Sequence, residues 1–153
     1  MDLSWWYFLI KLAAYSGWVG LGLSWFSSSK DSIPVRALLL GTLRLLMGLG
    51  FGIVIWLGGS MVFAGVGEVF HGDSEMIASA ITYLSVYIPV RWIEWSIFDA
   101  IMSPQSRTLR GFLLGPASRH RLWRLGGITV SCLADIPVIV SLGGILPVGR
   151  FMC

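Results

Sequence analysis

Residues 87–99 read YIPVRWIEWSIFD and lie within an apolar run that extends over residues 77–102. The run is long enough to cross a bilayer as a helix, because about 20 apolar residues span a hydrocarbon core of roughly 30 Å. It nevertheless contains Arg91, Glu94 and Asp99. Charged side chains inside a membrane are costly and face partners or water. The stretch therefore predicts a membrane helix whose charges are satisfied by neighbouring helices.

The composition of the whole chain agrees with this interpretation. Of 153 residues, 56% are hydrophobic and only 12% are charged, which is outside the usual balance of soluble proteins. Four apolar runs are long enough to form spans: residues 5–26, 37–64, 77–102 and 125–148. We predict an all-α, polytopic integral membrane protein, with a single transmembrane domain folded as a four-helix bundle. No room is left for a soluble catalytic domain.

The third loop, residues 103–124, is rich in arginine. Its second half reads SRHRLWRL from residue 118 and resembles a short segment lying at the membrane interface, with leucine and tryptophan inserted between the lipids. We expect Arg119, Arg121 and Arg124 to contact anionic lipid headgroups. A phosphate-bearing substrate is an alternative, but the headgroups account for these arginines without one.

Orientation follows from the lysine and arginine residues in the short loops. The first and third loops carry seven of them: Lys30, Arg36, Arg107, Arg110, Arg119, Arg121 and Arg124. The second loop carries none, and the C-terminal tail has only Arg150. We therefore predict that residues 27–36 and 103–124 are cytoplasmic and that both termini lie outside, in a plasma (inner) membrane.

Four charged residues fall at similar depths when the helical rise is counted from the cytoplasmic ends. Arg44 and Glu94 come out about 12 Å deep, Asp135 about 15 Å and Arg91 about 16 Å. An unpaired charge at this depth costs at least about 2.5–3.5 kcal/mol, so the four side chains are predicted to form one cluster in the inner half of the membrane, flanked by Tyr87. The cluster is either structural or functional.

Two further charges receive simpler interpretations. Asp99 lies about three residues from the cytoplasmic end of its helix and is expected to reach water or the arginines of the third loop. Lys11 lies about two turns into the first helix, so its side chain is expected to snorkel to the nearer interface. Neither residue is assigned to the cluster.

Glycines mark a packing face on the second helix. Gly41, Gly48, Gly52 and Gly59 are spaced by 7, 4 and 7 residues, which places them near one angular position. Such a seam lets a neighbouring backbone approach closely. The first helix has a similar face of small residues at Ser16, Gly20 and Ser24. Together these faces predict self-association or binding to other membrane subunits.

The second loop contains the donors Glu68, His71, Asp73 and Glu75, which could hold a cation. We favour a simpler interpretation, in which Asp73 or Ser74 caps the third helix and the remaining acids are solvated. The two cysteines lack any metal-binding or redox spacing. We therefore predict no metal site and no cofactor.

Three functions remain open. The first is a non-enzymatic membrane protein, acting as an oligomer or as a subunit of a complex, in which the charge cluster fixes helix packing. The second is a transporter or channel in which Glu94 and Asp135 take protons or cations, and Arg44 and Arg91 tune them or bind an anion. The third is an enzyme on an amphiphilic substrate, for which the sequence shows no nucleophile. Nothing in the sequence indicates binding to nucleic acid.

Overall fold

The computed structural model describes residues 3–27, 32–70 and 81–141, and this part of the chain is helical without any strand, so the all-α class is confirmed. The elements are α1 (Leu3–Phe26), α2 (Ile33–Phe70), the π-helix η1 (Tyr83–Tyr87), α4 (Ile88–Met102), the 3₁₀-helix η2 (Pro104–Arg107), α5 (Leu109–Leu114) and α6 (Ser118–Ser141). The predicted start of the third span (residues 77–80), the predicted end of the fourth (142–148) and the donors at 71, 73 and 75 lie outside the described residues.

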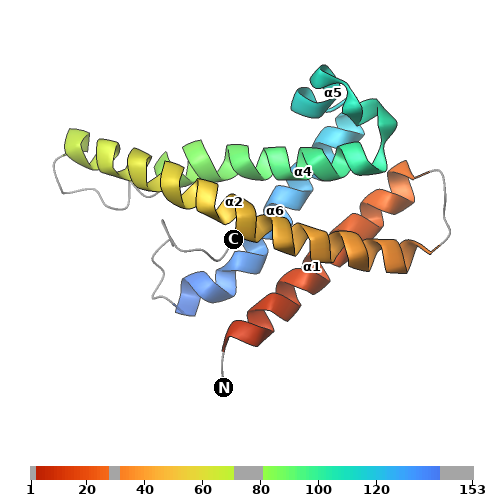
Figure 1. Ribbon diagram of the computed structural model, residues 1–153, viewed down its shortest axis with the longest axis horizontal. Helices are drawn as coiled ribbons and strands as arrows, with labels where there is room; N and C mark the ends of the chain where they lie inside the picture. Colours follow the sequence, from red (N-terminus) through yellow and green to blue (C-terminus); the bar gives the residue numbers. More distant parts are fainter. Residues whose placement is uncertain (1–2, 28–31, 71–80, 142–153) are drawn as a thin grey trace.

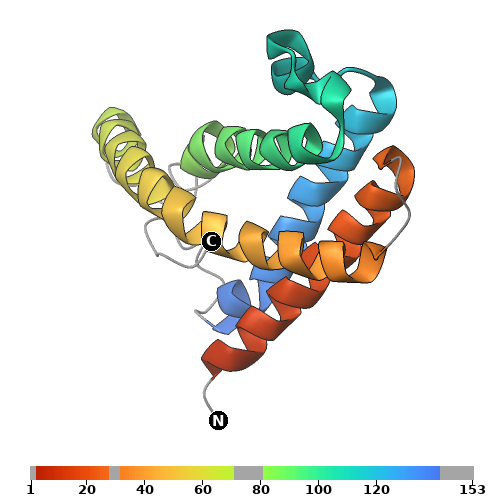
Figure 2. The same cartoon turned by 45° about the vertical axis from the view of Figure 1, so that its right-hand side comes forward.

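The long helices form two antiparallel pairs that cross obliquely (Figures 1 and 2). In one pair α1 packs against α6, and in the other α2 runs beside η1 and α4. Figure 1 shows the ends of α1 and α4 and the beginnings of α2 and α6 at one end of the molecule. The end of α1 and the beginning of α2 therefore lie on the same side as the third loop, as an up-and-down bundle requires.

The structure corrects the predicted interfacial segment in the third loop. Residues 118–125 are the first turns of α6 and continue directly into the predicted fourth span. The chain reverses earlier, where Gly115 adopts a φ of 76° after α5 and Pro116 follows it. A left-handed glycine followed by proline ends one helix and allows the next to start at once. The short element of this loop is instead η2 together with α5.

Two prolines occupy different places in their helices: Pro34 lies at a helix beginning, where the missing backbone donor is tolerated, whereas Pro89 lies inside the continuous helix that η1 and α4 form. Pro34 is the second residue of α2, and Pro89 is the second residue of α4. Because Pro89 cannot donate to the preceding turn, the helix before it widens into the π-helix η1, closed by a hydrogen bond from the Ile88 N–H to the Tyr83 carbonyl. This wider turn sets the position of Tyr87 at the end of η1.

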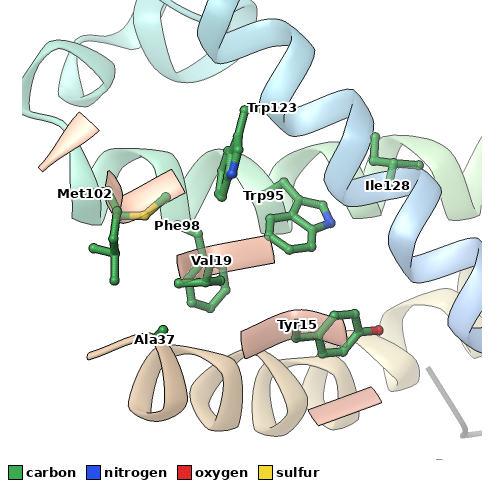
Figure 3. Packing of buried hydrophobic residues seen from close by; sticks show 9 residues of the cluster. Tyr15, Val19, Ala37, Trp95, Phe98, Met102, Trp123 and Ile128 are labelled. Carbon is green, nitrogen blue, oxygen red and sulfur yellow. The ribbon is translucent and has the colours of Figure 1, made fainter. Parts of the chain in front are cut away.

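The core is formed largely by aromatic side chains from α1, α4 and α6. Trp95 and Trp123 are fully buried, with ring centroids 5.1 Å apart in an edge-to-face arrangement, and Phe98 packs beside Trp95 (Figure 3). Tyr15 of α1 meets Trp95 at 6.2 Å. Such aromatic pairs contribute roughly 0.5–1.5 kcal/mol beyond the area that they bury. The core therefore joins α1, α4 and α6, and Ala37 adds α2 to the same cluster (Figure 3).

At the α1–α6 interface, a tryptophan of each helix packs against a glycine of the other. A Cβ atom on Gly126 would lie 2.2 Å from Trp18, and one on Gly22 would lie 2.7 Å from Trp123. Each indole also donates across the interface, Trp18 to the Trp123 carbonyl at 3.0 Å and Trp123 to the Trp18 carbonyl at 3.2 Å. Close packing therefore depends on the absence of side chains at both glycines.

The predicted glycine seam of α2 is buried at all four positions: Gly41, Gly48, Gly52 and Gly59. A Cβ atom on Gly41 would lie 2.9 Å from the backbone of Ser16 in α1, and one on Gly59 would lie 3.5 Å from Thr82. The seam is therefore occupied inside the chain by neighbouring helices. The argument that this seam is available for self-association is wrong, because neighbouring helices of the same chain cover it.

The outer surface of the helices is strongly apolar. By length and composition one helix of the described part, Ile33–Val66, could cross a membrane, with 34 residues and a mean hydropathy of 2.1. Only 22% of its most apolar window is buried inside the structure, whereas the core helix of a soluble protein would be mostly buried. This favours membrane association. The other three predicted spans are not established by this criterion.

Candidate functional site

Three of the predicted cluster residues meet around the carboxylate of Glu94, which α4 directs into the bundle. Glu94 Oε2 accepts a hydrogen bond from Arg44 of α2 at 2.5 Å and another from Arg91 at 2.9 Å. All three side chains are fully buried. One carboxylate thus links two guanidinium groups and joins α2 to α4.

Asp135 of α6 is connected to this group through a tyrosine. The Tyr87 hydroxyl lies 2.9 Å from Arg91 Nη2 and donates to Asp135 Oδ2, and Arg91 Nη2 itself is 3.9 Å from that carboxylate oxygen. Arg91 also packs over the Tyr87 ring at 4.6 Å. The structure therefore brings all five predicted side chains into one continuous group that spans α2, the η1–α4 helix and α6.

The group contains two residues of α1 that the sequence did not assign to it. Lys11 Nζ lies 2.7 Å from Asp135 Oδ1, and the Tyr7 hydroxyl donates to the same oxygen at 3.0 Å. Lys11 is 1% exposed, so the predicted snorkelling is wrong. Its position opposite Asp135 is favoured because pairing satisfies two buried charges at once.

We call Lys11, Arg44, Arg91, Glu94 and Asp135, with Tyr7 and Tyr87, the inner charge cluster. Its three positive and two negative groups leave a net charge of plus one. Arg44 also faces the Tyr15 and Trp95 rings at 5.0 and 5.3 Å, an arrangement in which aromatic faces attract a cation. Among the described residues, Arg44 Nε and Nη1 and Glu94 Oε1 have no hydrogen-bond partner.

A second buried ion group lies nearer the third loop, and the sequence predicted only part of it. Asp99 is fully buried, and its carboxylate accepts two contacts from Arg124, at 2.8 Å from Nε and 2.7 Å from Nη2. His120 Nδ1 lies 2.7 Å from the other carboxylate oxygen. The expectation that Asp99 reaches the third-loop arginines is correct for Arg124, while exposure of Asp99 to water does not occur.

Arg124 does not contact lipid headgroups, which corrects the predicted role of this residue. Its side chain is fully buried and also donates to Ser96 at 2.8 Å and to the carbonyls of Phe112 and Gly111 at 2.6 and 2.8 Å. Because α6 begins at Ser118, Arg124 lies on the helix face that points inward. Arg119 and Arg121 remain exposed.

Two open pockets flank the beginning of α6. One, of about 510 Å³, is lined by Trp25, Phe26, Gln105, Arg119 and His120, among others. The other, of about 490 Å³, contains Arg110 and Arg121 near α5. Each pocket thus contains one of the two exposed arginines of α6.

The neighbouring Ser106, His120 and Asp99 do not form a hydrolytic triad. Ser106 Oγ is 3.5 Å from His120 Nδ1, the same nitrogen that faces Asp99, whereas a triad requires the serine and the acid on opposite nitrogens. Within the described residues, no three His, Cys, Asp or Glu side chains are grouped to hold a metal ion.

Comparisons of the chain with protein-family models, curated proteins and solved structures found no match. The inner charge cluster and the pockets are therefore interpreted from their own geometry.

Proposed function

We propose that this chain is a four-span integral membrane protein without catalytic activity, acting as an oligomer or as a subunit of a membrane complex. In this proposal α1, α2, η1–α4 and α6 cross the bilayer, and the first and third loops are cytoplasmic. The inner charge cluster holds the four helices in register. The membrane is proposed to be a plasma (inner) membrane with both termini outside.

The distribution of charge is the observation that carries the proposal. Seven charged side chains are buried: Lys11, Arg44, Arg91, Glu94, Asp99, Arg124 and Asp135. The exposed charges of the described part are all arginines in or beside the third loop: Arg107, Arg110, Arg119 and Arg121. Beyond the first turn of α6, the long helices present no described exposed charge. A charged interior behind an uncharged outer surface fits lipid on the outside.

The helix ends support the same orientation. The exposed arginines lie at the same end of the molecule as the end of α1 and the beginning of α2, which matches the excess of basic residues in cytoplasmic loops. Trp25 is 41% exposed at this end and Trp5 is 74% exposed at the beginning of α1. Tryptophans in these positions fit the two interfacial belts of a membrane protein.

A structural role for the inner charge cluster is supported by its pairing. Each charged member lies within 4 Å of an opposite charge. Contacts reach the cluster from each of the four long helices. A group of this kind specifies how helices are arranged, because misplacing one helix leaves a buried charge unpaired.

The outer face of α2 is the surface that we propose for assembly. It presents Leu46, Leu49, Ile53, Leu57 and Met61, each between 47% and 77% exposed. Gly50 lies on the same side and meets nothing within 4 Å of a Cβ atom. Van der Waals packing of such a face against another membrane helix drives association in lipid.

Ion-coupled transport is the second candidate. Its support is the set of buried atoms without described partners on Arg44 and Glu94, together with the π-helix beside Tyr87, since π-helical turns occur frequently at functional sites. Substitution of both Arg44 and Glu94 separates the two candidates. For a structural pair, the double exchange loses less stability than the two single losses add up to, whereas a transport site loses function in all three variants.

The mass of the purified protein tests the proposal. Native mass spectrometry from detergent should give a mass well above the 16.8 kDa of one chain, either a multiple of it or a defined heteromeric complex. Leu57→Trp on the outer face of α2 should reduce that mass, while Leu122→Trp near the third loop serves as the exposed control. A single chain of 16.8 kDa under all conditions would contradict assembly.

A further inference from the structure

The pocket lined by His120 at the beginning of α6 combines a buried histidine, the N-terminus of a helix and an exposed arginine. We call it the His120 pocket; the residues that matter here are Trp25, Phe26, Gln105, Ala117, Arg119 and His120. It lies between the end of α1, η2 and the beginning of α6, at the end of the molecule that carries the exposed arginines. In the proposed orientation this is the cytoplasmic interface of the membrane.

His120 is a buried side chain, and one of its two ring nitrogens makes no hydrogen bond to a described residue. Its Nδ1 is held by Asp99 at 2.7 Å, and its ring stacks on Phe26 with centroids 4.1 Å apart. The residue is 6% exposed, and its Nε2 makes no hydrogen bond to any described residue. Because Asp99 fixes the other nitrogen, Nε2 points away from Asp99 and supplies the polar group of the pocket.

The N-terminus of α6 opens on the same space. Ala117, Arg119 and His120 all line the pocket, and the first backbone bond of the helix runs from the Arg121 N–H to the Ala117 carbonyl at 3.2 Å. The N–H groups of the preceding turn therefore have no partner within the helix, and Ala117 has no side-chain acceptor to cap them. Backbone donors and the helix dipole together favour an anion at such a position.

The charge around the pocket is positive. Arg119 is exposed at its edge and packs over the Trp25 ring at 5.4 Å, which holds the guanidinium beside the opening. None of the described residues that line the pocket is acidic. Asp99 lies behind His120, but two contacts from Arg124 compensate its charge. The pocket therefore attracts an anion, because no described carboxylate near it is left uncompensated.

We propose that the His120 pocket binds a phosphate group, with Arg119, His120 Nε2 and the first-turn N–H groups of α6 as its ligands. A phosphate oxygen can accept from the backbone donors and from the guanidinium, and Nε2 can donate to it or accept from a phosphate hydroxyl. Phosphate on an anionic phospholipid and free inorganic phosphate share the acceptor oxygens, and only the free ion also has a hydroxyl to donate. The inference does not depend on the oligomeric state proposed above.

The test uses the full chain in nanodiscs. Phosphatidylcholine discs that contain about 20% phosphatidylglycerol are compared with discs of pure phosphatidylcholine. Inorganic phosphate is then added to the pure phosphatidylcholine discs. Binding is read from the thermal unfolding midpoint and from competition between the two phosphates. Either anionic phosphate should raise the midpoint relative to pure phosphatidylcholine, whose own phosphate is neutralised by its choline group. If only phosphatidylglycerol raises the midpoint, the bound phosphate belongs to a lipid. If inorganic phosphate at millimolar concentration abolishes the effect of phosphatidylglycerol, the pocket binds free phosphate.

Matched variants locate the site. Arg119→Gln and His120→Gln should each weaken binding by about tenfold, as expected for the loss of one charge-assisted contact. Arg121→Gln removes the same charge two residues away but faces the other pocket, so its affinity should stay within about twofold. Ala117→Phe fills the pocket from an exposed position without changing charge and should also weaken binding.

Several outcomes would overturn the proposal. Equal losses in Arg119→Gln and Arg121→Gln would show diffuse attraction to the basic loop in place of a site. Unchanged affinity in Ala117→Phe would place the phosphate elsewhere, even if His120→Gln failed to fold. A midpoint that neither phosphatidylglycerol nor inorganic phosphate raises would exclude selective binding of an anionic phosphate, while the mass measurement on the oligomer would be unaffected.

Discussion

Glu94 is the side chain whose removal should damage the protein most. It is the only acidic residue of the described chain within salt-bridge distance of Arg44, and it also pairs with Arg91. Glu94→Gln raises the net charge of the inner charge cluster from plus one to plus two and leaves the Arg44 guanidinium buried without a counter-ion. Removing one member of a buried pair typically costs about 3–5 kcal/mol, and we expect a loss of unfolding free energy in this range.

Arg44→Met should cost less, although it breaks the same 2.5 Å contact. Glu94 then keeps Arg91 as its partner, and the net charge of the cluster falls to zero. The expected loss is that of one charge-assisted hydrogen bond, about 1.5–3 kcal/mol. The double variant carries neither unpaired group, so its loss should fall below the sum of the single losses by roughly 1–3 kcal/mol.

The assay is equilibrium unfolding in mixed micelles, followed by tryptophan fluorescence, because Trp95 lies 5.3 Å from the Arg44 guanidinium and reports on this region. Ile93→Ala is the control, since Ile93 precedes Glu94 but is 39% exposed on the outer face. Its cost should stay under about 1 kcal/mol. Equal losses for Glu94→Gln and Arg44→Met, or a double variant that equals the sum, would refute the pairing argument.

Three further predictions concern other parts of the fold. Asp99→Asn should destabilise the protein by about 3–5 kcal/mol in the same unfolding assay, because it leaves Arg124 buried without its carboxylate; a surface-like loss under about 0.5 kcal/mol would contradict this. Gly41→Ala should cost about 1–3 kcal/mol through overpacking against α1, whereas Gly50→Ala, which meets nothing within 4 Å, should gain up to about 1 kcal/mol of helix propensity; similar shifts in thermal midpoint would count against the seam. A cysteine placed at the exposed Ser118 in a cysteine-free background should react with an impermeant reagent only from the cytoplasmic face, and labelling from outside intact cells would reverse the proposed topology.

The grouping of Arg44, Arg91, Glu94 and Asp135 followed from depth alone. The rise of a helix is fixed, so counting from the cytoplasmic ends compares charges on different helices, and the cost of an unpaired charge favours convergence. Rotation about each helix axis could not be obtained in this way. The structure supplies it, and also shows Tyr87 as the link between Arg91 and Asp135.

The position of the Lys11 side chain was predicted wrongly, because the snorkelling argument considers only the distance from the residue to the nearest membrane interface. The useful signal was its spacing: Tyr7, Lys11 and Tyr15 recur every four residues, so Lys11 shares a face with two tyrosines. All three are buried in the structure. A lysine on a face that packs against other helices meets a partner, here Asp135, before it can reach the interface.

Asp99 was expected to reach water or the third-loop arginines, but its burial and its contact with His120 were missed because the beginning of α6 was predicted too late. With the helix starting at Ser118, His120 and Arg124 lie one turn apart on one face and meet Asp99 together. The signal for the earlier start was Gly115 followed by Pro116, which marks a break before residue 118. Treating residues 118–125 as interfacial placed Arg124 on the wrong side of the helix.

A direct measurement of the Arg44–Glu94 contact in lipid tests the central claim that paired charges hold this bundle together inside the membrane. Solid-state NMR on protein in bilayers, with ¹⁵N-labelled arginine and ¹³C-labelled glutamate, reads the distance between guanidinium nitrogens and glutamate carboxyl carbons. We predict dipolar contacts shorter than about 4 Å, in keeping with hydrogen-bonded ion pairs, that weaken in Arg44→Met, where only the Arg91 contact remains, and disappear in Glu94→Gln. Absence of any such contact in the wild-type protein, or its persistence in Glu94→Gln, would contradict the claim.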